Sequence, residues 1–158
     1  MQNLEEYERE KESARPYYGK IGSVFSPALN TNIHFNSEGF NHIIYRNKRE
    51  ERDKSSQILR FKLLPLVFEL VQLSTTHQEY EEIMQEIVAE KYGKCTKENK
   101  LVIYWGVIAI IKRRKIKVVL RKIGNGQVMF WSVIPAWNTS KYRDMKFFHS
   151  MEGDPQTD

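Results

Sequence analysis

Three successive segments rich in β-branched and aromatic residues fill residues 101–137, and they constrain the fold more than any other feature. They read LVIYWGVIAIIK, KIKVVLRKI and QVMFWSVIPAW, and such residues are enriched in β-strands. Lys112 to Lys115 form a basic turn between the first two. Asn125-Gly126 separates the last two, and this dipeptide is the strongest short signal for a β-hairpin. The segments predict an antiparallel meander of three or four strands that ends at Pro135.

Helical signals fill much of the chain before this meander. Asn36-Ser37 is a capping pair for a short helix with the sequence EGFNHIIYRN, and residues 53–56 are good caps for a second helix. That helix continues through QILRFKLL and PLVFELVQL, with a kink or a restart at Pro65. Residues 2–14 form a polar helix or a mobile leader, which Arg15-Pro16 ends.

Residues 74–94 give the clearest helical pattern. Apolar residues recur there on one side at helical spacing, glutamates cover the other side, and Gly93 ends the segment. The sequence as a whole therefore predicts an α+β protein, with N-terminal helices packed on one face of a C-terminal antiparallel β-meander. The apolar positions of this helix are Tyr80, Ile83, Met84, Ile87 and Val88.

Charge is distributed unevenly along the chain. Residues 99–143 contain ten Lys or Arg and no Asp or Glu, whereas acids gather at residues 5–12 and 79–90. We therefore expect one basic and one acidic side, and a one-sided basic surface attracts polyanions such as RNA. The alternative is a solvated charged face without a partner.

The predicted hairpin brings a cation and a hydroxyl together. If Asn125-Gly126 is a two-residue loop, Val119 faces Ser132 and Arg121 faces Phe130. Arg121 and Ser132 then share a face as diagonal neighbours, so one oxyanion could touch both. The alternative is a surface arginine beside an incidental serine.

His42 is the second candidate for chemistry. It precedes a dense run of cations, which would lower its pKa, leave a neutral base near physiological pH and bind phosphate. The alternative is a structural or solvated histidine. The nearby cations are Arg46, Lys48, Arg49 and Arg52.

Other classes of chemistry have no support in the sequence. Cys95 is the only cysteine, so no intrachain disulfide or cysteine metal cluster is possible. We find no metal-ligand spacing, no Gly-rich phosphate loop and no nucleophile elbow, and we expect no metal or cofactor. The N-terminus lacks the apolar core of a signal peptide, and the longest apolar stretch is too short to cross a bilayer. We expect no membrane association.

The order IHFNSEGFNHIIY, ILRFKLLPLV and IKVVLRKIGNGQVMFWSVIP resembles the phage-associated nucleases of the barnase/EndoU/colicin/RelE-like (BECR) fold. The resemblance covers about residues 20–137, and its most specific part is the VVLRKIGNGQVMFWSV hairpin. It implies a toxin-like, metal-independent endoribonuclease that cleaves RNA, for example tRNA, by attack of the 2′-OH to give a 2′,3′-cyclic phosphate.

The resemblance also implies site residues and partners. The chain lacks the second histidine that EndoU-like members use, so Lys48 or Arg46 would substitute for it. An acidic immunity protein or antitoxin would neutralise the enzyme, which would act in the cytoplasm, also after delivery into a target cell within a larger effector. The implied catalytic residues are His42, Lys48, Arg60, Arg121 and Ser132, and the implied RNA-binding residues are Arg46, Arg49, Lys122 and Trp137.

Two other functions remain open from the sequence. The basic sheet could belong to a non-catalytic nucleic-acid-binding module, in which His42 is structural. The acidic segment could instead be the working surface of a protein-interaction domain. The expected domain organisation is a polar leader helix or mobile arm at 1–19, a nuclease-like domain at 20–148 and a disordered tail at 149–158.

Overall fold

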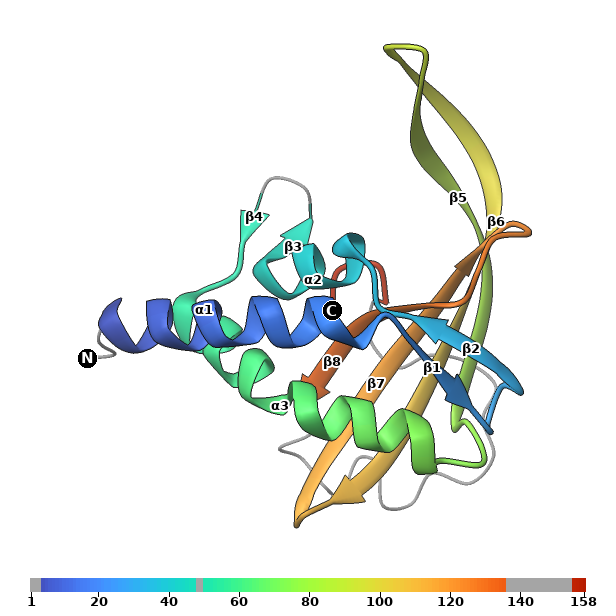
Figure 1. Cartoon of the computed structure of the whole chain (residues 1–158). Coiled ribbons are helices and arrows are strands. Elements are labelled where there is room, and N and C mark those ends of the chain that lie inside the picture. The colour runs from blue at the N-terminus through green and yellow to red at the C-terminus, as the bar shows by residue number, and fades with distance from the viewer. Residues whose placement is uncertain (1–3, 48–49, 136–154) are drawn as a thin grey trace.

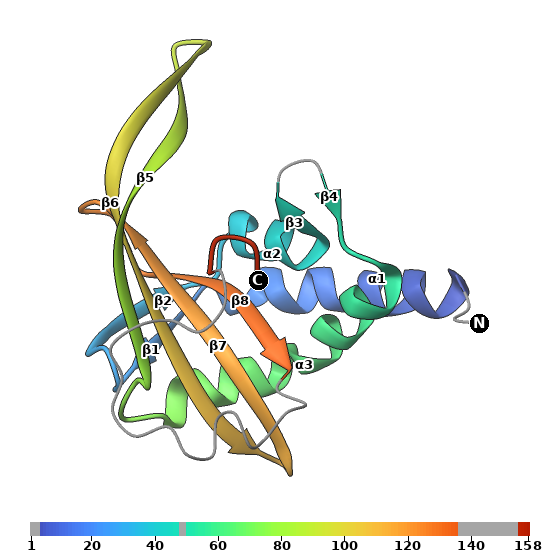
Figure 2. The same ribbon diagram turned by 180° about the vertical axis from the view of Figure 1, so that it is seen from behind.

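The computed structural model describes residues 4–47, 50–135 and 155–158, which form an α+β fold (Figure 1). Helices α1 and α3 lie across one face of a six-stranded sheet, as Figure 2 shows from behind. The described helices are α1 (Leu4–Ile21), α2 (Ser37–Ile44) and α3 (Lys54–Leu73). The strands are β1 (Ser23–Ser26), β2 (Thr31–His34), β3 (Tyr45–Asn47), β4 (Glu50–Glu51), β5 (Glu79–Lys91), β6 (Lys94–Ile111), β7 (Arg114–Ile123) and β8 (Met129–Pro135).

The main sheet has the order β1-β2-β8-β7-β6-β5. Strands β5 to β8 pair antiparallel with their sequence neighbours, which confirms the predicted meander with four strands. The β1–β2 hairpin extends this meander into a six-stranded sheet. His34 of β2 pairs in parallel with Met129, and the His34 amide donates to the Val128 carbonyl at 2.9 Å. The α+β class predicted from the sequence is therefore confirmed.

The predicted helix at residues 74–94 is wrong, because this segment contains strand β5. β5 pairs with β6 from Glu79↔Gly106 to Lys91↔Lys94, and the hairpin projects as a long twisted ribbon (Figure 1). Tyr92 and Gly93 both have positive φ, 53° and 73°, as a two-residue type I′ hairpin turn requires. Gly93 thus serves a turn, and Glu86 of β5 pairs with Lys97 of β6 at 3.5 Å.

The β7–β8 hairpin differs from the prediction at its turn. The turn is centred on Gly124-Asn125, because the Gly126 amide donates to the Ile123 carbonyl at 2.9 Å and Gly124 has φ of 53°. Positive φ at the first central residue is the feature of type II′ turns. A two-residue turn at these positions would set Arg121 opposite Val128. Arg121 pairs instead with Met129, and not with the predicted Phe130, so the chain between the turn and β8 contributes one extra residue. The register then shifts again between Val119 and Leu120.

This shift is a bulge at Trp131, which has no Cα partner on β7. One extra residue on β8 moves the pairing by one position, and together with the extra residue before Met129 it brings the strand back to the predicted register. The predicted pairing of Val119 with Ser132 therefore holds, although the predicted turn does not. Arg121 and Ser132 share a sheet face, as expected. The residue opposite Arg121, Met129, precedes the bulge on β8, and Ser132 follows it.

Both long helices continue through a proline. α1 does not end at Arg15-Pro16, and α3 does not restart at Pro65. Burial holds α1 in place: Tyr7 and Tyr18 are 2 % and 4 % exposed. The Tyr7 hydroxyl donates to Gln57 of α3 at 2.7 Å. Residues 4–21 are thus a helix packed into the core.

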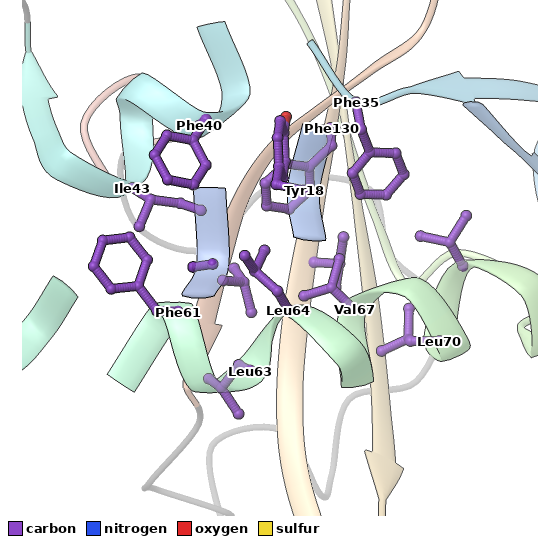
Figure 3. Packing of buried hydrophobic residues seen from close by; sticks show 14 of the residues in the cluster. Tyr18, Phe35, Phe40, Ile43, Phe61, Leu63, Leu64, Val67, Leu70 and Phe130 are labelled. Carbon is purple, nitrogen blue, oxygen red and sulfur yellow. The ribbon is translucent and has the colours of Figure 1, made fainter. Parts of the chain in front are cut away.

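The core lies between the helices and the sheet (Figure 3). Aromatic rings from α1, α2, α3 and β8 meet there with Phe35, which directly follows β2. The Phe35 and Phe130 rings stack with centroids 5.2 Å apart. Leu64 and Val67 of α3 fill the space beside them. This packing fixes α2 and β8 relative to each other, and those two elements carry most of the candidate site.

Some predicted features lie outside the described residues, namely Lys48, Arg49, Trp137 and residues 149–154 of the tail. Residues 155–158 lie against the domain, where their main-chain oxygens accept hydrogen bonds from Trp131, Arg52 and Ser132. None of the described helices is long and apolar enough to cross a membrane.

Candidate functional site

Helix α2 places His42 beside strand β8. Its N-cap is Asn36, as predicted, because the Asn36 side chain accepts from the Gly39 amide at 3.2 Å. A Cβ at Gly39 would lie 2.5 Å from the Phe130 carbonyl oxygen and 2.6 Å from the Tyr18 hydroxyl. Gly39 therefore lets the helix approach the β8 backbone closely, one residue from the Trp131 bulge.

The bulge presents the Trp131 indole to both His42 and Arg121. The imidazole of His42 stacks on it with centroids 4.0 Å apart and planes 17° apart. The Cζ atom of Arg121 lies 3.5 Å from the Trp131 ring centroid. Arg121 Nη2 also pairs with Glu38 of α2 at 3.0 Å. Trp131 thus links the helix to the sheet through a histidine and a cation.

Two side chains from these elements converge on one oxygen atom. The main-chain oxygen of Asp158 lies 2.6 Å from His42 Nε2 and accepts from Ser132 Oγ at 2.8 Å. Two further main-chain oxygens of the same segment accept from neighbouring groups. Trp131 Nε1 donates to Pro155 at 2.8 Å, and Arg52 Nη2 donates to Thr157 at 3.1 Å.

Arg52 is the cation nearest to the imidazole. The β3–β4 hairpin returns the chain to the end of α2, where the Arg52 amide donates to the Ile44 carbonyl at 2.8 Å. Arg52 Nε donates to the His42 carbonyl at 3.0 Å, and its Nη2 lies 3.2 Å from His42 Nε2. Since the Asp158 oxygen can only accept, Nε2 carries the proton and donates to it. The Arg52–Nε2 contact becomes a hydrogen bond only when Nε2 is free to accept.

Burial and charge keep His42 neutral. Burial is the main cause that lowers its pKa to about 3, and Arg52, Arg121 and Arg60 lower it further, while the hydrogen bond to Asp158 raises it. Burial likewise lowers the pKa of Arg52 to about 10, and Arg60 contributes in the same direction. Cations crowded in a buried place favour an anionic ligand between them.

The structure brings four of the predicted site residues near one another. His42 and Ser132 share a hydrogen-bond partner, and Arg121 and Arg60 are close enough to act on the pKa of His42. Arg60 is 9 % exposed, and its Nε has no hydrogen-bond partner in the described part of the chain. The expectation that Arg121 and Ser132 would contact the same oxygen finds no support, because the Arg121 guanidinium faces Trp131 and Glu38.

Two predicted RNA-binding residues lie outside this cluster. α2 ends at Ile44, so Arg46 falls on β3 and not one helical turn after His42; it is exposed and pairs with Glu50 at 3.9 Å. Lys122 follows Arg121 on β7 and so points to the other face, where it lines a groove of about 590 Å³ with His34 and Trp105.

Neither Trp131 nor any of residues 155–158 is among the site residues predicted from the sequence. Trp131 belongs to an apolar strand, and only the bulge turns it toward His42. Arg52 was predicted only as one of the cations that follow His42. The β3–β4 hairpin returns the chain and so brings Arg52 into contact with His42. No set of three His, Cys, Asp or Glu side chains within residues 4–47, 50–135 and 155–158 is placed to hold a metal ion.

Comparison of the chain with known protein families, with curated proteins and with solved structures found no match in any of the three. The resemblance to toxin ribonucleases therefore stays a prediction from the sequence. The geometry around His42 is the separate basis on which a function can be argued.

Proposed function

We propose that the protein is a toxin-like endoribonuclease that cleaves RNA through the 2′-OH and needs no metal for the chemical step. One observation carries the proposal: a neutral imidazole and a hydroxyl donate to the same oxygen atom, at 2.6 and 2.8 Å, in a place crowded by arginines. A nonbridging phosphate oxygen would find the Ser132 hydroxyl and the Arg52 guanidinium there, with the imidazole of His42 beside it.

His42 would act as the acid–base group. Its lowered pKa keeps the ring neutral at neutral pH. Once no acceptor occupies Nε2, the ring proton can reside on Nδ1, and Nε2 then has the lone pair that accepts the 2′-OH proton. A positioned group of this kind contributes on the order of 10²–10⁴-fold to the rate. Attack of the 2′-oxygen on the phosphorus then gives a 2′,3′-cyclic phosphate and a 5′-OH, with the nucleophile supplied by the substrate.

The surrounding groups would stabilise the charge of the pentacoordinate phosphate. Ser132 donates a hydrogen bond to a nonbridging oxygen, and Arg52 lies beside the same position. Arg60 is buried with its Nε unpaired in the described chain, so it can add positive charge and a donor. Arg121 would act as a positioning residue through Trp131.

Purified protein incubated with total RNA and with tRNA, in EDTA, tests the proposal. We expect 2′,3′-cyclic phosphate ends, and a loss of at least about 100-fold in His42→Gln. Full activity of His42→Gln, or cleavage abolished by EDTA, would contradict it. RNA binding without cleavage in any variant would favour the non-catalytic binding module instead. A matched DNA oligonucleotide, which lacks the 2′-OH, should remain intact.

The proposal extends to a partner and a place of action. An enzyme that cleaves cellular RNA in the cytoplasm harms the cell that makes it, so we propose an acidic immunity protein or antitoxin that covers the cationic site. Toxicity on expression, relieved by His42→Gln, is the corresponding observation in cells.

A further inference from the structure

Residues 155–158 fill the candidate site with their own oxygen atoms. Three main-chain oxygens of this short segment, those of Pro155, Thr157 and Asp158, accept hydrogen bonds from Trp131, Arg52, Ser132 and His42. These donors come from β8, α2 and the chain before α3, so the segment bridges elements that are distant in the sequence. Figure 1 shows the end of the chain beside α2 and β8.

The segment also matches the site in charge. The Asp158 carboxylate raises the pKa of Arg52 and of Arg60, so its negative charge lies within electrostatic reach of both guanidinium groups. An acceptor oxygen on His42 and Ser132, combined with a negative charge near two arginines, reproduces what a phosphodiester would offer.

We propose that residues 155–158 are an intramolecular ligand that occupies the phosphate position of the site and must leave before RNA binds. The inference rests on the proposed function for its substrate, but occupancy of the site by the segment can be measured without catalysis. The segment stands where the RNA backbone would lie and competes with it directly.

Occupancy by the segment blocks the acid–base group as well as the binding position. While His42 Nε2 donates to the Asp158 oxygen, it has no lone pair with which to accept a proton from a 2′-OH. When the segment leaves, the ring proton can move to Nδ1, which gives Nε2 a lone pair. Arg52 Nη2, 3.2 Å away, can then reach this nitrogen or the incoming phosphate. The segment therefore fills the site and keeps the proton of His42 on Nε2, where the imidazole cannot act as a base.

The segment can leave without disturbing the core. None of its four residues belongs to either apolar cluster of the described chain. Main-chain oxygens of the segment accept from Ser132 and Arg52, and a phosphate group can offer acceptors to the same two donors. Withdrawal thus exchanges one set of hydrogen-bond acceptors for another, whereas the helices and the sheet stay as they are.

Binding measurements on three variants test the proposal. One variant ends at residue 154, a second carries Asp158→Asn, and a third carries Gln156→Lys. The last two change the net charge by the same amount, but Gln156 is exposed whereas Asp158 lies near Arg52 and Arg60. The probes are inorganic phosphate and a labelled 2′-O-methyl RNA oligonucleotide, which carries phosphates but cannot be cleaved through a 2′-OH.

We expect the shortened variant to bind both probes about tenfold more tightly, as it would if the segment occupied the site about 90 % of the time. Asp158→Asn should show part of this gain and Gln156→Lys should show less. The pKa of His42 should change in the shortened variant, because the hydrogen bond to Asp158, which raises this pKa, is lost together with any cover that the segment gives the ring. Equal affinities in the full chain and the shortened variant, with an unchanged His42 titration, would overturn the proposal.

RNA cleavage separates the two proposals. Tighter binding without cleavage in the shortened variant would leave the intramolecular ligand standing and remove the ribonuclease function. Cleavage at the same rate with and without residues 155–158 would retain the ribonuclease and overturn the intramolecular ligand. Faster cleavage by the shortened variant supports both.

Discussion

His42 and Trp131 stack with their ring centroids 4.0 Å apart and their planes 17° apart, although the two residues come from a helix and from the bulge of a strand. The stack covers one side of the imidazole and limits its rotation. Because Arg121 lies over the same indole, one aromatic side chain fixes the orientation of the acid–base group relative to a cation.

We therefore expect Trp131→Phe to retain most of the RNA cleavage proposed above and Trp131→Ala to lose about tenfold in kcat. An aromatic pair contributes about 0.5–1.5 kcal/mol, and about 1.4 kcal/mol corresponds to tenfold in rate. The phenylalanine variant lacks the N–H that donates to Pro155, so it should also bind inorganic phosphate more tightly. Equal kcat values for the two variants would show that the stack does not position His42.

The close approach of α2 to β8 makes Gly39→Ala destabilising. The new methyl group would lie 2.5 Å from the Phe130 carbonyl oxygen, and a main-chain atom inside a sheet cannot yield as a flexible side chain can. We expect a loss of about 1–3 kcal/mol in the free energy of unfolding, as for other overpacked sites, measured by urea denaturation.

Gly19→Ala is the matched control for Gly39→Ala. Gly19 also lies in a helix, but a Cβ there would have no atom within 4 Å. Alanine should therefore be neutral or stabilise by up to about 1 kcal/mol, because it replaces glycine within a helix. Similar losses in both variants would mean that helix propensity, and not the contact with β8, dominates.

The fold could be predicted from the sequence where local signals and tertiary packing agree. The caps at Asn36 and Asp53 lie where predicted, since capping is a property of a few adjacent residues. The prediction of a helix at residues 74–94 was wrong because aromatic and β-branched residues such as Tyr80, Ile83 and Ile87 occur in strands as well as on one side of a helix. Pairing with β6 along its whole length decides between the two, and this long-range contact overrides helical propensity.

The candidate site was predictable only in part, because several of its contacts join residues that are far apart in the sequence. His42 and Ser132, two candidates from separate parts of the sequence, lie beside one main-chain oxygen, and their role in binding an anion stays a prediction. The cation that contacts His42 is Arg52 rather than Arg46, because α2 ends at Ile44 and a hairpin returns the chain. The contact of residues 155–158 with residues more than 100 positions earlier leaves no local signal.

The low pKa of His42 predicts that the protein loses stability as the pH falls. Its pKa is about 3 in the folded protein and 6.5 as the ordinary value, so between these values the unfolded chain binds the proton more readily. Stability from this group is complete above about pH 6.5 and is lost progressively toward pH 3, on the order of a few kcal/mol. His42→Gln should show a shallower decline over this range in urea denaturation. If the free energy of unfolding fell equally with pH in His42→Gln and in the unchanged protein, groups other than His42 would cause the acid sensitivity.

Glu79 and Lys117 form an ion pair at 2.9 Å, with side chains 0 % and 2 % exposed. Glu79→Ala would leave the ammonium group of Lys117 buried without that counter-charge, and such a change costs about 3–5 kcal/mol. Glu86→Ala is the control, because Glu86 pairs with Lys97 at 3.5 Å on the exposed part of the same hairpin, where an ion pair contributes about 0–1 kcal/mol. Urea denaturation of both variants should therefore give a large difference between two substitutions of the same type. A small loss for Glu79→Ala would mean that Lys117 reaches water or loses its proton in the variant, and a pH-dependent unfolding midpoint would identify the second case.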